Sequence, residues 1–102
     1  MKLVWSDRFK ERIRDYFDYC LVNYGKVATS KKQSKLNNIL NNLLRFPESY
    51  RIEPLLKNKD KEYRSINFEK DFKIIYSVGN EEIRLENLWN TKISPKNLKK
   101  DL

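Results

Sequence analysis

The apolar positions of the chain change their spacing along its length, and the first part predicts a strand and a helix. Residues 2–5 are short, apolar-leaning and β-prone, which predicts a first strand. Ser6 is a suitable N-cap, and Asp7 after it suits the positive end of a helix dipole. Gly25 stands where a left-handed residue would end this helix. The apolar positions at helical spacing between them are Phe9, Ile13, Tyr16, Phe17, Cys20, Leu21 and Tyr24.

A second helix is predicted over residues 27–46. Its first half has no apolar face, because residues 29–32 are polar or charged. Pro47 is expected to end it, since proline lacks the N–H that would continue a helix. The second half carries one clear apolar stripe, formed by Leu36, Ile39, Leu40, Leu43 and Leu44.

From residue 63 onward the period changes to two, which predicts strands. A polar stretch over residues 49–61 comes first, and we expect Leu55 and Leu56 to anchor it by packing. Strands follow over residues 63–67 and 72–78, and Gly79-Asn80 signals a tight turn before a last strand. On that last strand, one face is predicted to carry Ile83, Leu85, Asn87 and Trp89.

These elements predict a single α+β domain over residues 1–102, in the order β-α-α-β-β-β. A two-helix hairpin would cover one face of a small, mostly antiparallel sheet that ends in a three-strand meander. The other face would stay partly open and is therefore the candidate functional surface.

Composition narrows the function classes. The chain has 102 residues, with 22 Lys and Arg against 14 Asp and Glu, for a formal net charge of +8. This balance predicts an anionic partner: RNA, DNA or an acidic protein. The chain has no histidine and one cysteine, which excludes an internal disulfide, a zinc site and histidine-dependent nucleophiles. We expect a cytoplasmic protein without metal, cofactor, signal peptide or membrane span.

The candidate chemistry lies on the predicted open face of the sheet. Lys73 alternates with the apolar residues of its strand and should point away from the helices, and Arg64 and Lys92 are placed to converge near it. Cations fixed on a sheet can hold a phosphate backbone and stabilise charge during phosphodiester cleavage. The alternative is that these are ordinary solvated side chains, which composition favours for any single one of them.

Other residues have a functional and a structural interpretation. The lysines at positions 31, 32 and 35 would form a nucleic-acid footprint or a solvated helix face. Tyr63 would stack on a base or donate a proton, although packing is favoured. Cys20 is interpreted as a small core residue and Glu86 as a solubiliser of an edge strand.

Several short motifs occur together in the order of a known family. They are a tyrosine-arginine pair in residues 63–66, an aromatic-basic-aliphatic-aliphatic-tyrosine strand at 72–76, and a closing strand at 88–95 that runs through tryptophan and lysine to proline, followed by Leu98. In the N-terminal half the matching features are Trp5-Ser6, the segment 44–47 and Pro54-Leu55. Together they resemble the RelE/ParE superfamily of toxins from type II toxin–antitoxin systems over nearly the whole chain.

The resemblance implies a compact toxin that a cognate antitoxin holds inactive, with oligomers formed through the antitoxin. It also implies one of two mechanisms. RelE-like members enter the ribosome and cut mRNA without a metal, using the ribose 2′-hydroxyl to attack the phosphate. ParE-like members inhibit DNA gyrase and catalyse no known reaction.

Three basic positions carry over from the RelE-type catalytic site. Arg64 corresponds to a substrate-binding basic residue, Lys73 stands in place of a phosphate-stabilising arginine, and Lys92 stands in place of a second arginine. The chain departs from the pattern at Ile66, where a second basic residue is absent, and in its tail, which has no tyrosine or histidine to transfer a proton. Acid–base catalysis contributes about 10²–10⁴-fold, so its loss weakens the nuclease interpretation unless Tyr63 or a glutamate substitutes.

We therefore predict a toxin of a type II toxin–antitoxin system and favour a ParE-like inhibitor of DNA gyrase. The alternative is a RelE-like, ribosome-dependent mRNA endonuclease in which Arg64, Lys73 and Lys92 are catalytic. A third hypothesis is a degenerate, non-toxic domain that binds nucleic acid.

Overall fold

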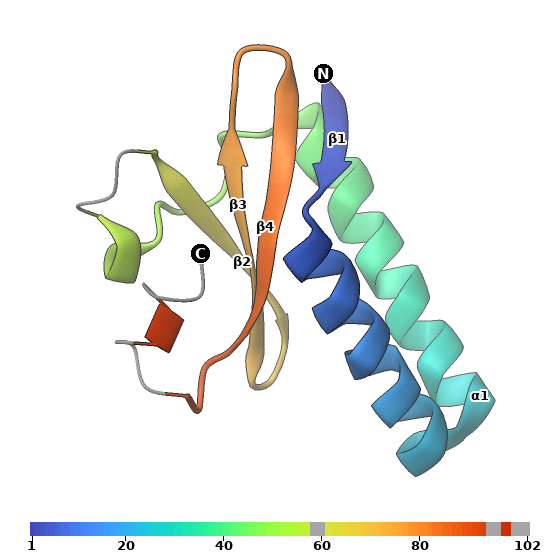
Figure 1. The fold of residues 1–102 in the computed structure, drawn as a ribbon. Helices are drawn as coiled ribbons and strands as arrows, with labels where there is room; N and C mark the ends of the chain where they lie inside the picture. Colours follow the sequence, from blue (N-terminus) through green and yellow to red (C-terminus); the bar gives the residue numbers. More distant parts are fainter. Residues whose placement is uncertain (58–60, 94–96, 99–102) are drawn as a thin grey trace.

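The computed structural model describes residues 1–57, 61–93 and 97–98, so the last two residues of the motif at 88–95 lie outside it. None of the helices in the described residues combines the length and the hydropathy that a membrane-spanning segment requires. The chain forms a sheet with a long bent helix on one side (Figure 1). In order, the elements are β1 (Lys2–Trp5), α1 (Asp7–Arg45), the short 3-10 helix η1 (Pro54–Leu56), β2 (Tyr63–Glu69), β3 (Phe72–Val78) and β4 (Glu82–Asn90).

The prediction of two separate helices is wrong, because α1 is one helix with a bend at Gly25. Gly25 has φ 85° and ψ 177°, outside the helical region, with helical residues directly on both sides. A straight helix of 39 residues would be about 58 Å long, whereas the longest dimension of the molecule is 40 Å. The chain therefore reverses at the bend (Figure 1). We call residues 7–24 the first arm of α1 and residues 26–45 the second arm.

A side-chain hydrogen bond lies at the start of each arm. Ser6 is the N-cap, as predicted, and its hydroxyl accepts a hydrogen bond from the backbone N–H of Phe9 at 3.0 Å. At the start of the second arm, the hydroxyl of Thr29 donates to the carbonyl of Gly25 at 2.8 Å. A single glycine is thus enough to turn the chain, and no linker separates the arms.

The sheet has the strand order β1-β4-β3-β2. Strands β2, β3 and β4 form the predicted antiparallel meander, and the turn between β3 and β4 is closed by a 2.8 Å hydrogen bond from the N–H of Gly79 to the carbonyl of Glu82. The sequence predicted the first strand but not its partner in the sheet. In the structure β1 pairs with β4 in parallel, with Lys2 opposite Glu82. Parallel pairing is possible here because α1 and the meander provide a long connection.

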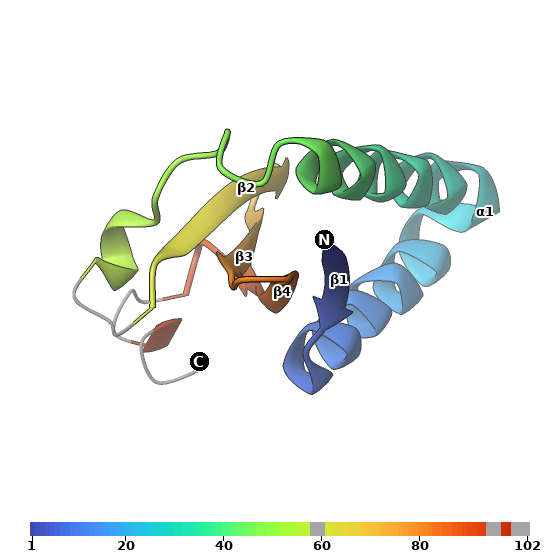
Figure 2. The same ribbon diagram turned by 90° about the horizontal axis from the view of Figure 1, so that it is seen from above.

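Both arms of α1 pack on one face of the sheet (Figure 2) and build the main core. Cys20 is fully buried, in agreement with its interpretation as a core residue. The buried members of the main core are Phe9 and Ile13 of the first arm, Leu36, Leu40 and Leu43 of the second arm, and Ile66, Phe68, Ile74, Tyr76, Ile83, Leu85 and Leu88 of the sheet.

The opposite face of the sheet is partly covered by a second, smaller core. Its buried members are Leu56, Ile75, Trp89 and Leu98, with Leu55 and Tyr63 packed beside them. The predicted anchoring by Leu55 and Leu56 is therefore confirmed. The sequence predicted that this face of the sheet would be partly open, and the smaller core covers part of the predicted open area.

A register shift in β4 corrects the predicted faces of that strand. Ile83, Leu85 and Leu88 belong to the main core, whereas Trp89 belongs to the smaller core on the other side. The ladder between β3 and β4 shifts between Ile75 and Tyr76, which is where β4 holds an extra residue. Such a bulge inverts the alternation beyond it, so the two halves of β4 follow opposite parity.

The segment after α1 runs along the free edge of β2. Ile52 forms a bridge with Arg64, and the N–H of Glu53 donates to the carbonyl of Tyr63 at 2.8 Å. The hydroxyl of Tyr76 donates to the carbonyl of Pro47 at 2.8 Å. These contacts fix the segment to the sheet and bring its carboxylates close to the candidate basic residues.

Candidate functional site

Arg64 lies on the side of β2 that faces α1, because it pairs with Tyr76 and stands two residues before Ile66, and both of these belong to the main core. Its guanidinium donates to the backbone carbonyl of Tyr50 at 2.6 Å and to the carboxylate of Glu62 at 2.8 Å. Only 15% of its side chain is exposed. These contacts tie β2 to the segment that follows α1.

Lys73 points to the opposite side of the sheet, as the sequence predicted. Its ammonium forms an ion pair with Glu53, whose side chain is fully buried. Burial lowers the pKa of the Lys73 ammonium, and the nearby charge of Arg51 lowers it further. Glu53 also caps η1, since its carboxylate accepts a hydrogen bond from the N–H of Leu55 at 3.4 Å.

Lys92 follows the end of β4 and is 72% exposed. Its ammonium lies 3.2 Å from the carboxylate of Asp71, at the turn between β2 and β3. Arg64, Lys73 and Lys92 therefore have three different carboxylate partners, and the first two are on opposite faces of the sheet. The structure does not bring the three candidate residues together.

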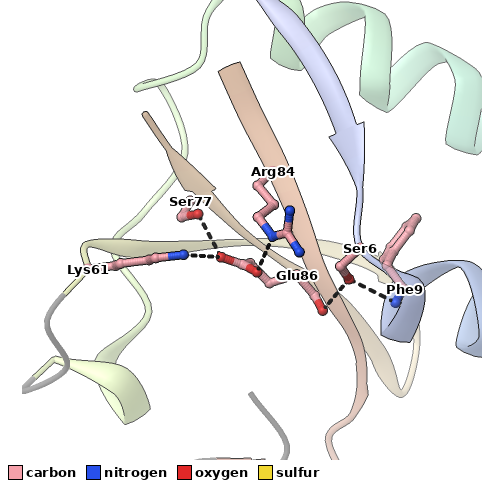
Figure 3. Close-up of polar contacts among 6 residues, drawn as sticks. All are labelled: Ser6, Phe9, Lys61, Ser77, Arg84 and Glu86. Atoms are coloured by element: carbon pink, nitrogen blue, oxygen red, sulfur yellow. Dashed lines mark hydrogen bonds and ion pairs between the residues drawn. The ribbon is translucent and has the colours of Figure 1, made fainter. Parts of the chain in front are cut away.

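A polar cluster that the sequence analysis did not single out centres on Glu86 of β4 (Figure 3). Its carboxylate accepts hydrogen bonds from Ser77 at 2.8 Å and Arg84 at 3.1 Å, and lies 3.4 Å from the ammonium of Lys61. Its backbone carbonyl accepts from the Ser6 hydroxyl at 2.9 Å, which links β4 to the N-cap of α1. Glu86 is only 11% exposed, so it is not the solvated solubiliser that we expected.

The sequence does contain a signal for this cluster. In β4 the apolar alternation of Ile83 and Leu85 breaks at Leu88 and Trp89, and a broken alternation indicates a bulge. Tyr63 lies in the same region, because it pairs with Ser77 in the ladder between β2 and β3. No group of three or more metal-binding side chains occurs among the residues that the structure describes.

The bend of α1 carries an apolar patch that faces solvent. The rings of Tyr19 and Tyr24 meet edge to face with centroids 6.1 Å apart. The bend projects away from the sheet in Figure 2. Exposed apolar residues gathered in one place are typical of a protein-binding surface. The members of this bend patch are Tyr19, Leu21, Val22, Tyr24 and Val27.

A groove of about 670 Å³ adjoins the bend patch, between the first arm and the turn joining β2 to β3. Tyr16, Tyr19 and Phe72 line it, and the cations Lys32 and Lys92 stand at its border. Burial and a hydrogen bond with the Cys20 side chain raise the pKa of the Tyr16 phenol above its ordinary value. The groove can accept an apolar side chain of a partner protein.

Solved structures with the same fold come from toxins of several bacteria. The chromosomal ParDE system of P. aeruginosa matches with a TM-score of 0.69 and 16% identity, covering 88% of this chain and 95% of that one. A YoeB/ParE toxin from Agrobacterium tumefaciens matches with a TM-score of 0.60 and 20% identity, covering 88% and 98%. A copper-bound mutant toxin from Helicobacter pylori matches with a TM-score of 0.58 and 26% identity, covering 90% and 96%.

Sequence comparison identifies the family directly. No curated protein matches the chain. The family model for the ParE toxin of the type II toxin–antitoxin system parDE matches residues 3–93. Because this match spans nearly the whole chain and the fold agrees, the protein belongs to the ParE toxin family, within the RelE/ParE superfamily that its motifs resemble.

Proposed function

We propose that this toxin stops growth by inhibiting DNA gyrase and that it does not cleave mRNA. The observation that carries the proposal is the separation of Arg64, Lys73 and Lys92. Phosphodiester cleavage requires cations preorganised around one phosphate. Here each cation is instead held by its own carboxylate, and Arg64 and Lys73 face opposite sides of the sheet.

The three residues carried over from the RelE-type site include no group suited to proton transfer, which supports the same proposal. The chain has no histidine, and the three candidate residues are an arginine and two lysines, with no imidazole or carboxylate among them to accept a proton. A gyrase inhibitor needs only a binding surface, for which the bend patch and its adjoining groove are candidates.

We also propose that a cognate antitoxin neutralises the toxin and that oligomers form through it. Two structural relatives support the antitoxin partner: the P. aeruginosa match is a ParDE system, and a DinJ–YafQ complex from E. coli matches with a TM-score of 0.54. Val22, 84% exposed, and Tyr24, 58% exposed, are the kind of apolar side chains that a partner would cover.

One observation favours the nuclease as a second candidate. The carboxylate of Glu86 lies beside Arg84 and Lys61, with Tyr63 near it across β3. Such a carboxylate can accept the proton of a ribose 2′-hydroxyl while the two cations bind the phosphate. If this site cleaves RNA, Glu86→Gln should abolish cleavage and Arg64→Ala should not.

Two assays with the purified toxin separate the candidates. In the first, gyrase supercoils a relaxed plasmid with increasing amounts of toxin. In the second, a defined mRNA is translated in a cell-free system and cleavage is mapped by primer extension. We expect inhibited supercoiling and intact message. Cuts that appear only on translated message would refute the gyrase proposal, and their loss in Glu86→Gln or in Arg64→Ala would show which site makes them.

The same assays address the third hypothesis. A degenerate nucleic-acid-binding domain would leave both supercoiling and mRNA unchanged and would not slow growth on induction. A toxin that stops growth only when its antitoxin is absent excludes that hypothesis. Arg64→Ala and Lys73→Ala are informative in both assays once circular dichroism shows that they are folded.

A further inference from the structure

The two arms of α1 differ sharply in charge. The first arm carries four acidic and four basic residues and is neutral overall. The second arm carries no Asp or Glu, and its net charge is +5. Its cations are Lys26, Lys31, Lys32, Lys35 and Arg45.

The exposed side of the second arm consists almost wholly of hydrogen-bond donors. The buried stripe of Leu36, Leu40 and Leu43 faces the sheet, so helical spacing turns the remaining positions outward. Val27 and Leu44 are the exposed apolar exceptions. Besides the cations, the outward positions are Ser30, Gln33, Ser34, Asn37, Asn38 and Asn41, all of them exposed.

Not all of the cations are available to a partner. Lys32 and Lys35 lie 3.6 Å and 3.7 Å from the carboxylate of Glu69, which draws them toward the sheet. For Lys26, Lys31 and Arg45, the described part of the chain offers no carboxylate within ion-pair distance. Lys26 and Lys31 line a shallow groove of about 780 Å³ along the arm.

We propose that the outward face of the second arm binds the phosphate backbone of duplex DNA. Lys, Arg, Ser, Asn and Gln are the side chains that donate to phosphate oxygens, and this face contains these types without a carboxylate to repel the ligand. This binding is separate from gyrase inhibition and needs no gyrase.

Duplex DNA fits this face better than other anions. An α-helix is about 10–12 Å across and can lie along the major groove of B-DNA, which is about 12 Å wide, with its cations against the phosphates of the groove edges. The deep major groove of A-form RNA is too narrow to admit it. An acidic protein would need apolar anchors, and the face offers only Val27 and Leu44.

The number of free cations sets the expected salt dependence. If Lys26, Lys31 and Arg45 each contact one phosphate, log K falls with log salt with a slope of about −2.7. Between 50 mM and 200 mM salt, the affinity should then fall about 40-fold. Binding of this kind is sequence-independent.

The test measures fluorescence anisotropy of a labelled DNA duplex with the full-length toxin at several salt concentrations. Lys26→Gln/Lys31→Gln should weaken binding about tenfold or more at 50 mM salt and reduce the slope by about two. The matched control is Lys10→Gln/Arg14→Gln, which removes the same charge from exposed positions of the first arm. The control should keep the wild-type slope.

Three results would overturn the proposal. One is the absence of duplex binding at 50 mM salt. Another is an equal loss in the control variant, which would indicate attraction by net charge alone. The third is tighter binding of single-stranded RNA or of a polyglutamate peptide than of the duplex. Since no gyrase is present, none of these results bears on the supercoiling assay.

Discussion

Replacing Gly25 by alanine tests whether the bend of α1 depends on a conformation that only glycine tolerates. The dihedrals of Gly25, φ 85° and ψ 177°, lie in a region essentially restricted to glycine, where a Cβ costs about 1–3 kcal/mol. Apart from the adjoining residues and the helix's own backbone, no atom lies within 4 Å of the added Cβ, so the cost is one of local backbone strain and not of crowding by other elements. Alanine also reduces the entropy of the unfolded chain, which offsets about 0.4–1 kcal/mol.

The net loss in the free energy of unfolding should therefore be about 1–2 kcal/mol. For a domain of this size, that lowers Tm by roughly 4–15 °C. Urea unfolding followed by circular dichroism gives the free energy directly. The arms would still pack on the same core, because Phe9 and Leu43 are fully buried and unchanged.

Gly79→Ala is the matched control for this prediction. Gly79 has no positive φ, and a Cβ there would meet Glu82 atoms at an ordinary contact distance of 3.6 Å. This variant should be as stable as the wild type or slightly more stable. If Gly25→Ala is no less stable than Gly79→Ala, the bend does not depend on the glycine conformation and the reasoning is refuted.

Three further substitutions test other contacts. Ser6→Ala removes the N-cap and the bond to β4, and should cost about 1–2 kcal/mol in urea unfolding; a loss below 0.3 kcal/mol, roughly, would contradict the capping role. Lys73→Met leaves the buried carboxylate of Glu53 without its cation and should cost about 3 kcal/mol, whereas the double variant with Glu53→Gln should recover much of that loss. Tyr76→Phe concerns pH: burial raises the pKa of the Tyr76 phenol, so the folded state keeps this proton when the unfolded chain loses it. Its contribution is complete below pH ~10 and is lost as the pH rises further, so Tyr76→Phe should show a shallower loss of stability between about pH 10 and 11; an identical pH profile would argue against it.

Local sequence signals placed most elements correctly. The N-cap at Ser6, the apolar stripe that includes Leu36 and Leu40, and the alternation in β3 each depend on neighbouring residues, so they can be read from the sequence. The sequence also indicated that the first helix is interrupted at Gly25. Whether a helix resumes at once or after a loop depends on how both arms pack on the sheet. That is why two helices were predicted and one bent helix is found.

Features that combine distant segments required the tertiary structure. The parallel pairing of β1 with β4 joins the two ends of the chain, and no local pattern encodes it. The bulge at Glu86 inverted the face of Trp89, because a single extra residue changes the parity of every later position in a strand.

For the candidate site, the sequence determined the residue types, and the fold determined which charged groups lie beside them. Composition and motifs alone identified a basic toxin-like chain with Arg64, Lys73 and Lys92 as its candidate cations. Whether these cations act together depends on which side of the sheet each one faces and on which carboxylates the loops bring beside them. Strand parity separates Arg64 from Lys73, and the segment after α1 delivers Glu53 to Lys73 from 20 residues away. The sequence gives the charge of each side chain. The electrostatic interaction between two side chains depends on the distance between them, which only the folded structure determines.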